Sequence, residues 1–265
     1  MKRPWWRGLV WVWALVMLLS SVPAAAAASG RSSGELGPFA ECPLARPSIE
    51  GCVQAVVTGG SLTVGWASLP LTAPIVLQGG FEATNTGIAF FGASDGETLS
   101  AAPQPVPGLT GMLAVTATVE LAGPASGRTE IVLNTGNLLT ETGTALTLPV
   151  VVKLDNRLLG DECTIGSSAD SIEISLTTGL SGSLQGSAGE LTSDASSGAN
   201  TLKDVKLVAA DFSVGLASGC GGSSSWFVDP LLNLALGLPA ATGESSAVLE
   251  ADLRTTPAAA LRGRR

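Results

Sequence analysis

Residues 92–96 read Gly-Ala-Ser-Asp-Gly and match the Gly-x-Ser-x-Gly pattern of a nucleophile elbow, in which a serine attacks an acyl carbon. Such a serine needs an imidazole as proton acceptor, and the chain contains no histidine. A Ser–Lys dyad would need a Ser-x-x-Lys spacing, which Lys153, Lys203 and Lys206 lack. We therefore interpret residues 92–96 as a turn.

A pair of carboxylates on opposite sides of a sugar bond suffices for glycoside hydrolysis without histidine. The chain has 22 acidic residues, so some pair at a suitable distance is expected by chance. Beyond residue 28 the only tryptophans that could stack on a sugar are Trp66 and Trp226. We expect Trp226 to pack beneath a disulfide instead. A His-free polysaccharide hydrolase with paired carboxylates is the alternative function.

Acidic residues gather at Asp155, Asp161 and Glu162, where they could hold a calcium ion together with backbone carbonyls. The spacing is not that of an EF-hand, so we interpret this stretch as a solvated acidic loop. A zinc site would need paired cysteines or histidines, which the chain lacks. We expect no catalytic residue, metal or cofactor.

The cysteines are four, Cys42, Cys52, Cys163 and Cys220, and an even number is typical of disulfide-bonded exported proteins. Three pairings are possible. We favour Cys42–Cys52, which closes a small loop that contains prolines, and Cys163–Cys220, which ties together two strand regions of the second half.

The beginning of the chain predicts a secretory signal peptide over residues 1–28. Lys2, Arg3 and Arg7 give a basic start, residues 9–19 are apolar, and small residues follow at 24–28. The apolar run is too short for a bilayer, which needs about 20 such residues. No second long apolar run follows. We expect a mature chain without a transmembrane span that is released or stays with the cell wall.

The chain is acidic, with a formal net charge of −8. The predicted leader holds three basic residues and no acidic one, so its removal lowers the net charge from −8 to −11. Such a surface repels phosphate backbones, and we expect no nucleic-acid partner. The expected partner is an unidentified extracellular or envelope component.

Aliphatic and polar residues alternate with a period of two over residues 112–122, 146–154, 172–177 and 246–254. Residues 58–60 (Thr-Gly-Gly) predict a hairpin turn between two such runs. These patterns predict an all-β fold, an antiparallel sandwich. It forms one domain over residues 42–255, with a sub-boundary near 124–128. A flexible lead-in precedes it at 29–41, and a disordered tail follows at 256–265.

One segment is typical of a helix and not of a strand. Leucines crowd residues 231–236, Asp229 would cap the first turn, Pro230 fits the first helical position, and Gly237 suits the end. With leucines nearly all round, a short buried helix near residues 230–236 is expected.

Several phrases resemble a group of uncharacterised secreted proteins of actinobacteria. The phrases are residues 134–139, 159–168, 176–179, 219–221, 228–231 and 236–239. The resemblance implies export and a shared β-fold, and the pairing of Cys163 with Cys220 fits motifs that recur together in that group. It implies no activity, cofactor or catalytic residue.

Together these observations predict a secreted, non-enzymatic protein that acts outside the cell or on the cell envelope, binding a partner or ligand through its loops. Besides the hydrolase, a carrier of an apolar ligand is a third hypothesis. It requires a sizeable cavity lined by valine and leucine.

Overall fold

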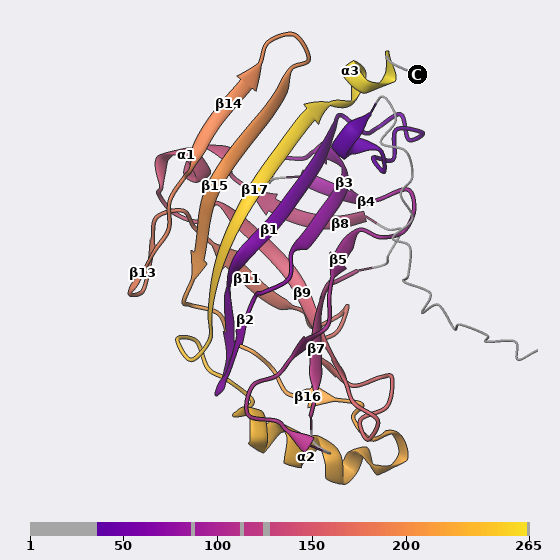
Figure 1. Cartoon of the computed structure of the whole chain (residues 1–265), viewed down its shortest axis with the longest axis vertical. Coiled ribbons are helices and arrows are strands. Elements are labelled where there is room, and N and C mark those ends of the chain that lie inside the picture. The colour runs from indigo at the N-terminus through magenta and orange to yellow at the C-terminus, as the bar shows by residue number, and fades with distance from the viewer. Residues whose placement is uncertain (1–35, 86–87, 112–113, 124–127, 264–265) are drawn as a thin grey trace, which may run out of the picture. The chain divides into compact units, whose positions relative to one another are not determined.

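The computed structural model describes residues 36–85, 88–111, 114–123 and 128–263. The predicted signal peptide, residues 1–28, lies outside the described residues. Antiparallel strands dominate the described part of the chain and confirm the all-β prediction. They form two layers that enclose a common apolar core (Figure 1).

The first layer is a row of antiparallel strands, and the hairpin of β14 (Glu190–Asp194) and β15 (Ala199–Ala209) forms one edge of it. In spatial order these strands are β14, β15, β17 (Ser246–Pro257), β1 (Gly51–Val64), β3 (Ile75–Ala83) and β4 (Ile88–Gly92). Two short strands extend it, β2 (Ala67–Pro70) beside β1 and β5 (Leu99–Ala101) beside β3.

The second layer is built around β9 (Leu146–Asp155), which pairs with four other strands. They are β7 (Thr116–Leu121), β8 (Arg128–Leu133), β10 (Thr164–Ile165) and β11 (Ile172–Leu176). The short strands β6 (Gln104–Pro105) and β16 (Ala217–Ser218) flank β7 and β10. Strand β8 pairs with β4 at one end and β9 at the other, so it joins the two layers.

The period of two in the sequence is what fills the space between the layers. In β11, Ile172, Ile174 and Leu176 are buried, whereas Glu173 and Ser175 between them are exposed. Strands β9, β15 and β17 contribute their own alternate residues to the same core. Because successive side chains of a strand point to opposite faces, this alternation fixes which face of each strand turns inward.

The hairpin turn predicted at residues 58–60 is wrong, because β1 runs straight through it. The register of β1 against β17 shifts between Val57 and Gly59. Gly60 has a φ of +123°, and a side chain there would collide with the carbonyl of Val248. Thr58 is therefore the extra residue of a β-bulge, and the hairpin turn lies further on, between β1 and β2.

The tail predicted to be disordered over residues 256–265 is instead ordered through residue 263. It finishes β17 and then forms a short helix, α3 (Ala258–Arg262), with Ala258 and Leu261 buried. The Arg262 guanidinium donates hydrogen bonds to the carbonyls of Arg46 (2.8 Å) and Ile49 (3.0 Å). The sequence pattern of the tail could not predict these contacts, because the partner residues lie more than 200 positions away along the chain.

The described end of the predicted flexible lead-in is also ordered. A short 3-10 helix, η1 (Gly37–Phe39), places Phe39 in a second apolar cluster with Ile49, Cys52 and Leu261. Thus the N- and C-terminal ends of the described chain pack together on β1. We call this the α3 cluster.

The strands of the two layers run from Gly51 to Pro257, and the bounds of the single predicted domain, residues 42–255, stay a prediction. Residues 124–127 of its predicted sub-boundary lie outside the described residues. The strands on either side of them, β7 and β8, both pair with β9. The remaining elements of the described chain are α1 (Thr135–Thr140), the 3-10 helix η3 (Gly222–Ser224), α2 (Ser225–Leu236) and the small hairpin β12 (Leu180–Ser181) and β13 (Leu184–Gln185).

Candidate functional site: an apolar surface on α2

Helix α2 is the predicted helix near residues 230–236, but it begins five residues earlier, at Ser225. Pro230 therefore lies inside the helix and not at its first position. The predicted end is correct: Gly237 has a φ of +71°, a left-handed conformation that glycine adopts without strain. The helix lies at the lower end of the layers in Figure 1, beside β16.

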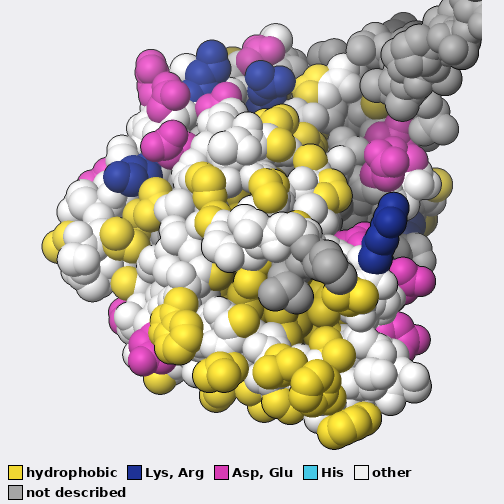
Figure 2. Space-filling view, turned by 60° about the horizontal axis from the view of Figure 1, so that its bottom comes forward, with side chains coloured by type: hydrophobic (Ala, Val, Ile, Leu, Met, Phe, Trp, Pro, Cys, Tyr) yellow, Lys and Arg dark blue, Asp and Glu magenta, His cyan; other side chains and the backbone are white. Residues whose placement is uncertain are grey.

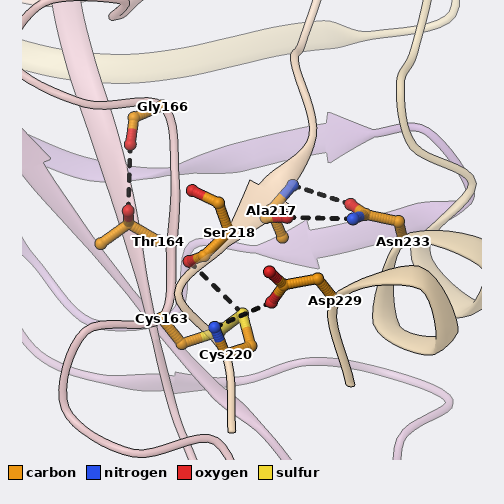
Figure 3. Close-up of a disulfide and its surroundings, with 8 residues drawn as sticks. All are labelled: Cys163, Thr164, Gly166, Ala217, Ser218, Cys220, Asp229 and Asn233. Carbon is orange, nitrogen blue, oxygen red and sulfur yellow. Dashed lines mark hydrogen bonds between the residues drawn. A yellow bond between two sulfur atoms is a disulfide. The ribbon is translucent and has the colours of Figure 1, made fainter. Parts of the chain in front are cut away.

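Asn233 fastens the inner face of α2 to β16. It is buried, its side-chain oxygen accepts a hydrogen bond from the Ala217 amide (2.7 Å), and its side-chain nitrogen donates to the Ala217 carbonyl (2.9 Å) (Figure 3). The amide side chain thus satisfies both backbone groups of one strand residue, as a neighbouring strand would. An exchange of this kind fixes the position of the helix along β16.

Asp229 was predicted to cap the first turn of the helix. Its side chain instead holds the disulfide loop. Its carboxylate accepts a hydrogen bond from the Cys220 amide at 2.8 Å (Figure 3). Cys220 is bonded to Cys163, and both sulfur-bearing residues are fully buried. The second disulfide joins Cys42 and Cys52. Both predicted pairings are therefore confirmed.

The outer face of α2 is apolar and exposed, which corrects the prediction of a buried helix. Leu232 and Leu236 point into the core, whereas Phe227, Leu231 and Leu234, spaced for one helix face, are more than half exposed. Figure 2, which brings this end toward the viewer, shows hydrophobic side chains gathered there.

Two tryptophans complete this surface. Trp226, expected beneath the disulfide, is 79% exposed, and its ring lies 5.7 Å from that of Phe227. Trp66, in the turn between β1 and β2, is 75% exposed. Its amide bonds to the Leu236 carbonyl (3.0 Å), and its ring packs on Gly237, where a Cβ would come within 2.7 Å. We call Trp66, Trp226, Phe227, Leu231 and Leu234 the α2 surface.

The segments that form the α2 surface carry almost no charge. Between Asp211 and Glu244 the only charged residue is Asp229, and its carboxylate is turned toward Cys220. No charged residue occurs from residue 51 to residue 81, the stretch that contains Trp66. The segments that form the α2 surface can therefore bury apolar groups against a partner without removing charges of their own from water.

Two polar hollows of the described chain contain no pair of carboxylates of the kind that a polysaccharide hydrolase would use. One hollow, of about 260 Å³ beside β16, is lined by a single carboxylate, Asp170. The other, of about 240 Å³ beside α3, is also lined by a single carboxylate, that of Asp194. These hollows give the hydrolase alternative no support.

Asp194 owes its distinctive environment to a turn and not to a catalytic partner. Hydrogen bonds from the Ser196 and Ser197 side chains and from the Ser196 amide lower its pKa to about 2. The residue ends β14, and these bonds close the turn to β15. A stabilised carboxylate in a tight turn accounts for the shift.

The remaining candidates from the sequence do not belong to α2, although Glu162 lies against Gly219, beside the disulfide that precedes the helix. Asp161 and Glu162 are exposed. Among the described residues no three histidine, cysteine, aspartate or glutamate side chains are grouped closely enough to hold a metal ion. Ser94 lies in the turn that follows β4, where its amide bonds to the Glu41 carbonyl, as the interpretation of residues 92–96 requires.

Comparison of the chain with protein families, curated proteins and solved structures finds no match. Within the described residues no helix has the length and apolar character needed to cross a membrane. The α2 surface was missed by the sequence reasoning. The sequence nevertheless indicated it. Leucines occupy nearly all sides of this helix, so some of these leucines must face outward when only one side of the helix packs on the protein.

Proposed function

We propose that the protein is an exported, non-enzymatic binding protein that acts outside the cell or on the cell envelope through its α2 surface. The observation that carries this proposal is the exposure of Trp66, Trp226, Phe227, Leu231 and Leu234, four of them on α2 and one beside its last residues, in segments that carry almost no charge. Exposed apolar groups of this kind are typical of surfaces that bind a partner.

Several features support export. The predicted leader over residues 1–28 and the resemblance to secreted actinobacterial proteins both point outside the cell. The two disulfides are typical of proteins that fold in an oxidising compartment.

The geometry of α2 supports a binding role. The disulfide, Asp229 and Asn233 fix the helix from the inside, so its outer side chains are presented on a rigid support. Rigid aromatic side chains lose little conformational freedom on binding, and tryptophan is enriched among the residues that dominate interface energies.

The test is retention of the mature protein on actinobacterial envelope fractions, compared with concentrated culture medium, for the natural sequence and two double variants. The first variant, W226S with L234S, removes two members of the α2 surface. The second, L180S with L191S, removes two exposed leucines elsewhere and serves as the matched control.

We expect the α2 variant to bind at least about tenfold more weakly, since one well-buried anchor contributes about 2 kcal/mol. The control should bind like the natural sequence. Equal retention of all three proteins, or an equal loss in both variants, contradicts the proposal.

A further inference from the structure

The space between the two layers holds a cavity of about 130 Å³. Its wall contains only alanine, valine, leucine and isoleucine side chains. Val57, Leu77 and Leu99 come from the first layer, and Val119, Leu148 and Ile174 come from the second. The cavity is thus a feature of the sandwich interior and is separate from the α2 surface.

A cavity of this size is unusual, because protein interiors pack as densely as organic crystals and contain few voids larger than a water molecule. Water does not fill it favourably, since no polar group of the wall could bond to it. An engineered apolar cavity of about 150 Å³ in another protein stays dry and binds benzene. The cavity described here falls in the same range.

Many side chains of the cavity wall are only partly buried. Val57, Leu77, Val119 and Leu148 are examples, although they face the interior of a sandwich. Ile174 of β11, which also lines the cavity, is buried. The accessible surface that the partly buried side chains keep includes the surface that faces the cavity, as expected where the core is not filled.

A second, smaller cavity of about 40 Å³ continues the apolar space toward α2. It shares Leu62 with the larger cavity, and Leu236, the last residue of α2, lies in its wall. Its other lining residues include Val64 of β1 and Leu154 of β9. Unfilled apolar space therefore extends along the core and is not confined to one packing defect.

We propose that the larger cavity binds a hydrocarbon group about the size of benzene, either as a free small molecule or as the apolar end of a lipid. The wall offers no hydrogen-bond partner, so a polar or charged group inside would lose its water without compensation. A headgroup must therefore stay outside. This inference goes beyond the proposed function and does not depend on it.

The experiment measures thermal unfolding of the disulfide-bonded mature protein with benzene, phenol or dodecanoate, the last below its micelle concentration. A ligand that binds the folded state raises the melting temperature with its concentration. We expect benzene or dodecanoate to raise it by several degrees and phenol to raise it less than benzene. A response to benzene alone identifies a small hydrocarbon, and a response to dodecanoate alone identifies a lipid tail.

Variants that fill the cavity locate the effect. Ala55 and Ala251 lie in its wall, so Ala55→Leu and, as a second choice, Ala251→Leu replace the empty space. They should abolish the response to ligand without lowering the melting temperature. Val56→Leu adds volume at the next residue of β1, which faces the opposite side, and should leave the response intact.

Methyl NMR of the natural sequence gives an answer that does not depend on a variant's folding. Benzene or dodecanoate should shift the methyl signals of Ile174 and Leu148 more than those of Leu231 and Leu234. Absence of any rise in melting temperature, an unchanged response in the filled variants, or shifts confined to the α2 surface each overturns the proposal.

Discussion

The α3 cluster and the α2 surface are two ends of the same sandwich, built from similar parts and finished differently. Each has a short apolar helix beside a disulfide. At α3 the apolar residues Ala258 and Leu261 are buried, and Arg262 ties the helix to the chain beneath it. At α2 the outward residues remain uncovered. The fold therefore covers the apolar side chains of α3 and leaves those on the outer face of α2 exposed.

The largest effect expected at either end is the loss of the Cys163–Cys220 bond, which closes a loop with a sequence separation of 57. Replacing both residues by alanine should lower the free energy of unfolding by about 4 kcal/mol, because the unfolded chain gains freedom. Replacing Cys42 and Cys52, separated by 10 residues, should cost about 3 kcal/mol. Urea unfolding of the two double variants measures both. A larger loss for the Cys42–Cys52 variant would reverse the order given by loop length.

The anchor of α2 should be next in size. Asn233→Ala leaves both the amide and the carbonyl of Ala217 buried without their partner, which should lower the free energy of unfolding by about 2 kcal/mol. Hydrogen exchange should accelerate in β16 and α2 before it does in β9. Asn200→Ala is the control, because Asn200 is an exposed residue of β15 whose side chain accepts a hydrogen bond from the Ser193 hydroxyl. It should change the free energy of unfolding by less than about 0.5 kcal/mol. Similar losses in both variants would deny Asn233 its anchoring role.

A smaller effect is expected at the α3 cluster, where Arg262 holds α3 to the chain beneath it. Arg262→Ala removes the hydrogen bonds to the Arg46 and Ile49 carbonyls and should cost about 1 kcal/mol in thermal or urea unfolding. Arg254→Ala, an exposed arginine of β17, removes the same charge without those bonds. If the two variants are equally stable, the bonds of Arg262 contribute nothing and α3 is held by its apolar residues alone.

The smallest effect concerns the β14–β15 turn, which lies beside α3. The folded pKa of Asp194, about 2, lies below its value in an unfolded chain, about 3.9. The turn is therefore stabilised at pH values above about 4, and this contribution is lost as the pH falls toward 2. NMR titration should show the low midpoint, and Ser197→Ala should raise it. An unchanged midpoint in that variant would mean that the serine hydroxyl does not hold the carboxylate.

The strands and disulfides could be predicted from the sequence because they depend on local patterns. The alternation in residues 172–177 places Ile172 and Ile174 on one face whatever their partners are. The pairing of Cys163 with Cys220 joined regions already recognised as strands. The even number of cysteines indicated disulfides, and the absence of histidine argued against a serine nucleophile activated by an imidazole.

The errors arose where a distant partner decides the outcome. Residues 58–60 suit a turn, yet β17 continues alongside and converts them to a bulge. The tail is held by carbonyls near residue 46, and no pattern within residues 256–265 indicates them. For α2, composition predicted the helix but not which side is packed, so Trp226 was expected to be covered and is not.

The position of the tryptophans has a practical consequence. Four of the six lie at residues 5, 6, 11 and 13, in the predicted leader, and the chain has no tyrosine. If the predicted leader is removed, the fluorescence excited in the near ultraviolet would come almost entirely from Trp226, which lies in α2, and Trp66, which lies beside the last residues of that helix. The intrinsic emission of a form cleaved after residue 28 would thus be a native optical probe of that end, and a blue shift on mixing with a partner would register burial there without any label.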